Sequence, residues 1–370
     1  MPKRTKKADH APKLSEEPGS ARTALSTMWT IRRFEEAVDE MFARGLLYGT
    51  MHLSIGQEAS ATGACWPLRD DDVITSTHRG HGHCIAKGAD LGRMMAELLA
   101  RDNGYCRGRG GSMHIADVTK GNLGANGIVA GGIPIATGAG LALKMQGTDR
   151  VAMCFFGDGA TSEGAFHESV NLAAIWNLPV VFVCENNHYG MSMSVENVSK
   201  LESVADRAKG YDIPGVSVDG NDVQAVADAA GEAVDRARQG GGPTLIESVT
   251  YRWKGHSKSD QNLYRTREEI ESWRARDPID RFENHLLEAG VLDEASIQAV
   301  RDEVRDAVRE AVRTGQRGPA SSKDLLKGVY APSEVDQVSI AGEPQPAEGE
   351  EAPAGPVAAA AGVSQGVDAP

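Results

Sequence analysis

The chain has 370 residues, of which 41% are hydrophobic and 25% are charged, and its formal net charge is −13. This length suffices to bury the core of one large α/β domain or of two smaller domains. The acidic balance argues against a nucleic-acid-binding surface, which requires a clustered basic face, and against anchoring on an anionic membrane.

No apolar run in the sequence approaches the roughly 18 residues that a membrane span requires. The five cysteines show no CxxC spacing, and an odd number of cysteines without a signal peptide predicts reduced thiols. The basic residues near the start are not followed by a hydrophobic segment, so they do not resemble a targeting signal. We therefore expect a cytoplasmic protein.

The N-terminal part of the chain divides into a tail and a helix. Residues 1–20 are polar and lack periodicity, which predicts a disordered tail. Apolar residues then recur at three- and four-residue spacing, which predicts a helix from Ala21 to Arg44. His52 follows this helix and precedes a segment rich in alanine and glycine, which permits close helix packing.

A short apolar segment at Ile74 leads into residues 77–83, where three histidines and one arginine lie among glycines. Histidines at this density allow a zinc site in principle. Arg79 lies among them, however, and its positive charge would repel the cation. We therefore favour an anion-binding site, in which Arg79 supplies charge and the histidines donate hydrogen bonds.

Two glycine-rich segments follow, and neither is specific by itself. Residues 107–114, RGRGGSMH, are equally compatible with a flexible surface turn and with an active-site loop. Gly138 and Gly140 resemble the start of a phosphate-binding loop, but Leu143 occupies the third glycine position. Tight packing of a helix against a partner subunit explains these glycines better.

Residues 151–190 carry the clearest pattern in the chain. An apolar run, 151–156, ends at Gly157-Asp158-Gly159, and a helical pattern follows it. A second apolar run, 180–183, ends at an asparagine pair, so that 26 residues separate Gly159 from Asn186. This order predicts a β-α-β unit, which requires a parallel sheet and a right-handed crossover.

The polar residues at the ends of these two strands predict a metal site. Ligands bind beyond the carboxyl ends of parallel strands, and Asp158 and Asn187 both lie at such ends. A carboxylate and an amide oxygen suit Mg²⁺, which also takes oxygens from substrate phosphates. The flanking glycines, Gly157 and Gly159, let a phosphate approach the backbone closely.

Two other interpretations of this stretch were weighed. The glycine pair is compatible with an ordinary tight turn, and the asparagine pair with an ordinary loop. Gly157 and Gly159 also match half of a dinucleotide fingerprint, but Ser162 stands at the third glycine position and no acidic residue follows about 20 residues later. Asp158 would moreover face the pyrophosphate with like charge unless a cation lay between them.

The remaining elements continue the α/β pattern. Strands are predicted at 215–218 and 244–250, with a helix at 222–238 between them, and His256 follows the second strand at its carboxyl end. Helices are predicted at 267–276, 280–289 and 294–313. Residues 334–370 contain Pro, Ala, Gly and Glu without aromatic residues, which predicts a disordered tail and leaves residues 21–330 as the folded domain.

The GDG segment, the 26-residue interval and the asparagine pair together resemble the thiamine-diphosphate motif. From Thr27 to Ala311 the sequence resembles the alpha subunits of the first component of 2-oxo acid dehydrogenase complexes and of acetoin dehydrogenases. The resemblance implies an α/β thiamine-diphosphate-binding fold, with a central, mostly parallel sheet and helices on both faces. It also implies thiamine diphosphate and Mg²⁺ as cofactors.

The resemblance assigns roles to individual residues. Asp158, Asn187 and the carbonyl of Tyr189 match the magnesium ligands of the family. The resemblance further marks His52, His81 and His256 as catalytic residues. The residues that it places against the cofactor are His78, Arg79, Gly127, Val129, Gly157, Asp158, Gly159, Ala160, Asn187 and His256. His78 replaces a tyrosine of pyruvate-type relatives, and the His-Arg-Gly-His-Gly-His wording is more similar to acetoin-type enzymes.

The activity that the resemblance implies is oxidative decarboxylation of pyruvate, or cleavage of acetoin, with transfer of the two-carbon unit to a lipoyl group of an acyltransferase component. No residue matches the glutamate that activates the cofactor, which the family's beta subunit carries. We therefore expect a heterotetramer of two alpha and two beta subunits, and an inactive isolated chain. The alternatives are a branched-chain 2-oxo acid dehydrogenase, a dinucleotide-binding oxidoreductase and a catalytically silent scaffold.

Overall fold

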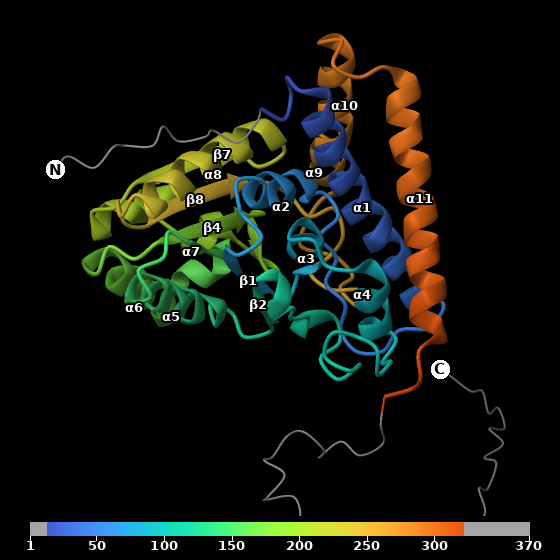
Figure 1. Ribbon diagram of the computed structural model, residues 1–370, viewed down its shortest axis with the longest axis horizontal. Coiled ribbons are helices and arrows are strands. Elements are labelled where there is room, and N and C mark those ends of the chain that lie inside the picture. The colour runs from blue at the N-terminus through green and yellow to red at the C-terminus, as the bar shows by residue number, and fades with distance from the viewer. Residues whose placement is uncertain (1–12, 322–370) are drawn as a thin grey trace, which may run out of the picture. The chain divides into compact units, whose positions relative to one another are not determined.

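The computed structural model describes residues 13–321, and a parallel sheet of six strands lies at its centre (Figure 1). All five pairings between neighbouring strands are parallel. The predicted α/β class with a mostly parallel sheet is thus confirmed. In spatial order the strands are β2 (Asn122–Asn126), β1 (Val73–Thr77), β3 (Ala152–Gly157), β4 (Val180–Asn186), β8 (Thr244–Val249) and β7 (Gly215–Asp219).

The predicted β-α-β unit is present. β3 and β4 pair in register from Ala152–Val180 to Gly157–Glu185, and the connection consists of a 3-10 turn, η3 (Asp158–Ser162), and α6 (Gly164–Ile175). β4 extends three residues beyond the predicted end at Val183, because Glu185 and Asn186 continue the ladder with β8. Asp158 and Asn187 therefore leave adjacent strands at the same edge.

Both faces of the sheet are buried, and alternate strand residues face different clusters. Cys154, Phe156 and Phe182 belong to one cluster, which α5 (Gly132–Met145) and α6 cover. Met153, Phe155 and Val183 belong to the other, which α2 (Glu58–Cys65) and α8 (Val223–Arg238) cover. Continuous apolar runs such as 151–156 are expected in strands that are buried on two sides.

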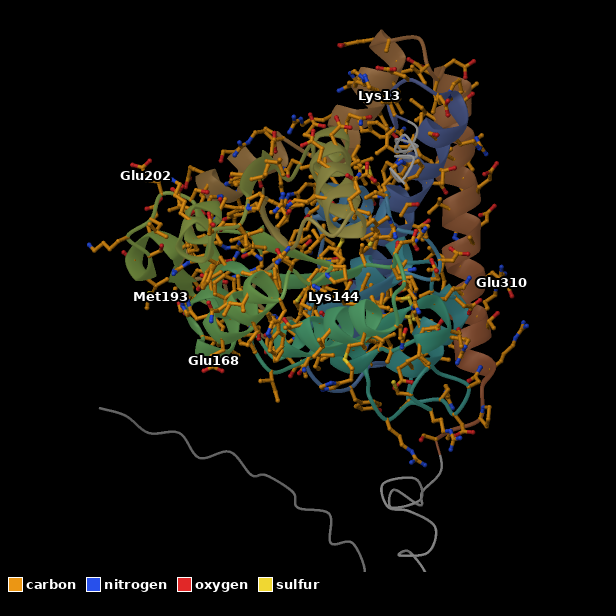
Figure 2. The ribbon with its side chains drawn as sticks, turned by 60° about the vertical axis from the view of Figure 1, so that its left-hand side comes forward. Lys13, Lys144, Glu168, Met193, Glu202 and Glu310 are labelled. Atoms are coloured by element: carbon orange, nitrogen blue, oxygen red, sulfur yellow. The ribbon has the colours of Figure 1, made fainter. Side chains whose placement is uncertain are left out.

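A layer of helices lies beside α2 and α8 (Figure 1). α1 (Pro18–Ala43), α10 (Pro278–Glu288) and α11 (Glu294–Arg317) share one core with them, and Glu310 lies on the outer side of α11 (Figure 2). The shorter elements are α3 (His81–Ala86), α4 (Leu91–Leu98), η1 (Ser112–His114), η2 (Val118–Lys120), β5 (Tyr189–Gly190), β6 (Met193–Ser194), α7 (Val195–Val198), η4 (Val204–Tyr211) and α9 (Arg267–Arg274).

The predicted limit of the N-terminal tail, residue 20, is too late. α1 already begins at Pro18, and Leu14 is fully buried in the core beside it. Ser15 also donates its N–H to Gln224 at the start of α8. Residues 13–20 are therefore part of the folded unit, whereas residues 1–12 and the predicted C-terminal tail at 334–370 lie outside the described residues. Within residues 13–321, no helix is long and apolar enough to cross a membrane.

Candidate functional site

A cavity of about 250 Å³ opens at the carboxyl edge of the sheet. The chain runs from β1 to β2 on one side and continues to β3 on the other, and a crevice is expected where the strand order reverses in this way. Most of the predicted site residues line the cavity. They are His78, Arg79, Val129, Gly157, Asp158, Gly159, Ala160, Asn187, Tyr189 and His256.

Three predicted residues do not line this cavity. Gly127 lies between two lining residues, Asn126 and Ile128. His52 lies directly behind the lining, with its ring centroid 4.6 Å from that of His78 and 4.9 Å from that of His256. His81 is fully buried and is treated next.

His81 is held by two hydrogen-bond partners. Its Nδ1 lies 3.0 Å from Glu35 Oε2 on α1, and its Nε2 lies 2.9 Å from Ser112 Oγ. Both ring nitrogens are therefore occupied away from the cavity. The structure does not bring His81 into direct contact with the cavity, so the geometry favours a positioning role over the predicted catalytic one.

The oxygen atoms expected to bind a metal converge on one side of the cavity. Asn187 Oδ1 and the carbonyl oxygen of Tyr189 both accept hydrogen bonds from Arg252 Nη1, each at 2.9 Å. The β5–β6 hairpin brings Tyr189 there, because Gly190 packs against Gly159 of the GDG turn. Of the asparagine pair, Asn187 lines the cavity, whereas Asn186 points elsewhere and donates from Nδ2 to Glu247 Oε1 at 2.8 Å.

Asp158 is buried, and one of its carboxylate oxygens is unpaired among the described residues. The residue is 3% exposed, and its Oδ2 has no hydrogen-bond partner within residues 13–321. Burial raises its pKa from an ordinary value of 3.8 to about 6, against the opposing effects of backbone hydrogen bonds and of the Arg252 charge. A buried carboxylate oxygen without a donor, beside an amide and a carbonyl oxygen, fits a hard divalent cation such as Mg²⁺.

The predicted anion-binding residues carry one fixed charge. Arg79 is buried, and it donates from Nη1 to the carbonyl of Leu53 at 2.6 Å and from Nη2 to the carbonyl of His256 at 2.9 Å. Burial and the neighbouring Arg252 lower the pKa of Arg79 to about 9. Burial, followed by the charge of Arg79, lowers the pKa of His78 to about 2 and that of His256 to about 4.

Sequence reasoning missed Arg252 completely. Its side chain is fully buried, and Nη2 also donates to Tyr264 OH at 2.8 Å. The available signal was its position, shortly after the predicted strand 244–250, on the edge where the other site residues lie. Ser76 and Glu185 were also missed. Both line the cavity. Ser76 Oγ lies 2.8 Å from His83 Nδ1, and Glu185 Oε2 lies 3.2 Å from His83 Nε2.

Comparison with known proteins identifies the relatives of this chain. A family model described as the dehydrogenase E1 component matches residues 26–322. The alpha subunit of an acetoin:2,6-dichlorophenolindophenol oxidoreductase from Bacillus subtilis is 54% identical over 74% of this chain and 85% of its own length. The protein of the same name from Cupriavidus necator is 46% identical, over 83% and 93% of the two chains.

A pyruvate dehydrogenase E1 component subunit alpha, from Porphyra purpurea, is 44% identical over 70% of this chain and 77% of its own. The family model covers most of the described residues, including every residue that lines the cavity. The chain therefore belongs to the dehydrogenase E1 component family.

Proposed function

We propose that the chain is the alpha subunit of a thiamine-diphosphate-dependent dehydrogenase that cleaves acetoin or oxidatively decarboxylates pyruvate. The cofactor follows from the family, and the observation that carries the magnesium assignment is the partnerless buried Oδ2 of Asp158. Mg²⁺ would bind this atom together with Asn187 Oδ1 and the carbonyl oxygen of Tyr189. A diphosphate would supply further oxygens to the ion.

The wall beside this metal position suits a diphosphate. A Cβ at Gly157 would meet nothing within 4 Å, so phosphate oxygens can approach the backbone there. Arg79 supplies a fixed positive charge to the cavity. With Mg²⁺ it offsets most of the negative charge of a diphosphate and of Asp158, and one opposite charge at about 4 Å contributes about 4 kcal/mol near a protein surface.

The apolar and imidazole groups of the cavity would serve the reacting end. Thiamine diphosphate supplies the carbanion and the electron sink for cleavage beside a carbonyl. Val129 and Ile128 present aliphatic surface, which excludes water from that end. His256, with His52 behind it, offers neutral imidazole nitrogens that can hold or accept a proton. His81 orients the Ser112 loop relative to α1.

The chain supplies one side of the site, and a beta subunit would cover the other. Ile128 and Val129 line the cavity and are nevertheless 74% and 52% exposed. The neighbouring α5 continues this apolar surface, with Ile135 and Met145 exposed on the face that also carries Gly138. An exposed apolar surface of this kind indicates a protein interface. It supports a heterotetramer of two alpha and two beta subunits.

The acyl group would then pass to a lipoyl group of an acyltransferase component. Relatives named for acetoin are 54% and 46% identical to the chain, and the reported relative named for pyruvate is 44% identical. We therefore place acetoin ahead of pyruvate as substrate, with branched-chain 2-oxo acids as the alternative.

The five cysteines are free, and four of them are buried, which fits a reducing compartment such as the cytoplasm.

The decisive experiment uses the full-length chain together with its beta subunit. Calorimetric titration should detect binding of thiamine diphosphate only when Mg²⁺ is present, and no binding of NAD. Reduction of 2,6-dichlorophenolindophenol should proceed with acetoin and more slowly with pyruvate. Binding of NAD without binding of thiamine diphosphate would favour the dinucleotide alternative. Unchanged assembly and turnover in Asp158→Ala would favour the scaffold alternative.

A further inference from the structure

A buried carboxylate on α4 organises the loop at residues 106–114, which contains the RGRGGSMH sequence. Glu97 is 1% exposed, and its two oxygens accept hydrogen bonds from four backbone N–H groups of this loop. The donors are Cys106 and Gly108, at 2.7 and 2.8 Å from Oε2, and Gly110 and Gly111, at 2.8 and 3.0 Å from Oε1. Backbone groups that belong to no helix or strand thus converge on one side chain.

The backbone of the 106–114 loop adopts a conformation that needs such support. Arg107 has a φ of +56°, in the left-handed region that is unfavourable for a residue with a side chain. Gly108 follows with a φ of +68°, and a Cβ there would lie 2.4 Å from the carbonyl carbon of Ala100. The loop is therefore both strained and closely packed, and the hydrogen bonds to Glu97 offset the cost of this conformation.

Two further contacts hold the loop from other directions. Ser112 Oγ lies 2.9 Å from Nε2 of His81, at the start of α3. Ser321, which follows α11, donates from Oγ to the carbonyl of Arg107 at 2.8 Å and from its N–H to the carbonyl of Ala100 at 3.0 Å. Three separate parts of the fold thus fix one loop.

The 106–114 loop packs against one rim of the cavity. A Cβ at Gly127 would lie 3.5 Å from Cε1 of His114 and 3.9 Å from the terminal methyl group of Met113. Gly127 itself lies between two residues that line the cavity. Directly after the loop, the carbonyl of Ile115 accepts a hydrogen bond from the N–H of Ala125 on β2, at 2.9 Å. The position of this rim therefore depends on the position of the loop.

We propose that Glu97 is a positioning residue for cofactor binding, which acts by fixing the 106–114 loop and, through it, residues 126–129 at the cavity rim. The inference rests on the proposed function, in which Ile128 and Val129 present aliphatic surface to the cofactor. These two side chains are 74% and 52% exposed, so their own packing does little to fix them. Glu97 is not among the residues that line the cavity, and it reaches the rim through the loop.

The first test needs no cofactor, because Arg107 and Arg109 place two exposed trypsin sites in the loop. In Glu97→Gln the amide keeps one acceptor oxygen and turns an NH₂ donor toward two of the four N–H groups. Trypsin should therefore cut the full-length chain after these arginines about tenfold faster or more than it cuts the natural chain, since cleavage follows local opening. Mass spectrometry of the first fragments assigns the cuts.

Glu283→Gln is the matched control, because it weakens another buried carboxylate far from the loop in sequence. Glu283, on α10, is 4% exposed and accepts hydrogen bonds from Trp29 Nε1 at 2.8 Å and from Arg301 Nε at 3.0 Å. Its substitution should lower the overall stability and leave the rate of cleavage within the 106–114 loop unchanged.

The second test titrates thiamine diphosphate in the presence of Mg²⁺ and the beta subunit. Glu97→Gln should raise the dissociation constant of the cofactor about tenfold, as expected if the competent rim is populated about a tenth of the time. At saturating cofactor, kcat should stay within about twofold of the natural value, since the bound cofactor selects that rim. Ser112→Ala, which releases the second contact, should raise the dissociation constant by a smaller factor, and Glu283→Gln should leave it unchanged.

Folding of every variant is checked by far-ultraviolet circular dichroism, and Ser112→Ala decides both tests if Glu97→Gln does not fold. The inference is overturned if the folded variant is cut in the loop no faster than the natural chain. It is equally overturned if the variant binds the cofactor as tightly as the natural chain and loses only active protein, because Glu97 would then have a structural role alone. A natural chain that binds no thiamine diphosphate would refute the proposed function itself, so the two failures are distinguishable.

Discussion

Replacing Asp158 by asparagine should stabilise the chain in the absence of metal and cofactor. The pKa of this carboxyl is raised from 3.8 to about 6 by burial. Because the folded chain binds the proton more tightly than the unfolded chain, the penalty from ionisation is absent only well below pH 3.8, grows as the pH rises from there toward 6, and is nearly complete at pH 7. At about 1.4 kcal/mol per pKa unit, the penalty at pH 7 is about 3 kcal/mol. An asparagine is neutral at every pH and avoids it.

The measurement is urea unfolding of the full-length chain between pH 4.5 and 8, for the natural sequence and for Asp158→Asn. The stability of the variant relative to the natural chain should rise across this range to about 3 kcal/mol. Asp102→Asn, an exposed control, should show no such dependence. When the beta subunit is present, addition of Mg²⁺ and thiamine diphosphate should stabilise the natural chain and leave the stability of Asp158→Asn unchanged. A variant that is less stable at pH 7.5, by an amount independent of pH, would mean that the carboxylate is paired and the reasoning is wrong.

Three further substitutions test the loop, the packing and the interface. Glu97→Gln should lower the free energy of unfolding by about 2–3 kcal/mol, because the buried carboxylate accepts hydrogen bonds from four backbone N–H groups of residues 106–111. A loss below about 0.5 kcal/mol in urea unfolding would contradict this. Gly140→Ala should cost about 1–3 kcal/mol, since its Cβ would lie 2.4 Å from a β4 side chain. Gly138→Ala should stabilise the chain by up to about 1 kcal/mol in the same urea titrations, since a Cβ there would meet nothing within 4 Å. Ile135→Asp should leave unfolding unchanged and weaken association with the beta subunit by about tenfold or more in sedimentation velocity; unaltered assembly would remove α5 from the interface.

The arrangement around Asp158 was predictable because it depends on few assumptions. Two apolar runs joined by one helix must form parallel neighbours, and the polar residues at their carboxyl ends must then lie side by side. His256 follows from the same argument, since it comes after another strand of the same sheet. In each case the direction of the strand places the residue, and no detail of side-chain packing is needed.

The histidines of residues 77–83 show where that reasoning fails. His78 enters the cavity, whereas His81 turns toward Glu35, which lies 46 residues earlier on α1. The difference arises because α3 begins at His81 and directs its side chain away from the sheet edge toward α1. Arg252 escaped notice for a related reason. Its burial depends on hydrogen bonds to the β5–β6 hairpin and to Tyr264. The order of strands along the sequence does not predict that either segment lies beside Arg252.

The titratable groups of the cavity share one property that bears on assembly. Burial moves the pKa of Asp158 up and those of His78, His256 and Arg79 down, so each shift disfavours the charged form. A site built from paired charges would show the opposite shifts. This cavity instead keeps partly desolvated groups whose partners must come from a ligand. A subunit that covers the exposed Val129 side removes more water from the cavity and so increases the desolvation cost of its charged groups. A bound metal ion and diphosphate would compensate this cost, because they supply the opposite charges. Binding of the cofactor and of the partner subunit should therefore be cooperative, each raising the affinity of the chain for the other.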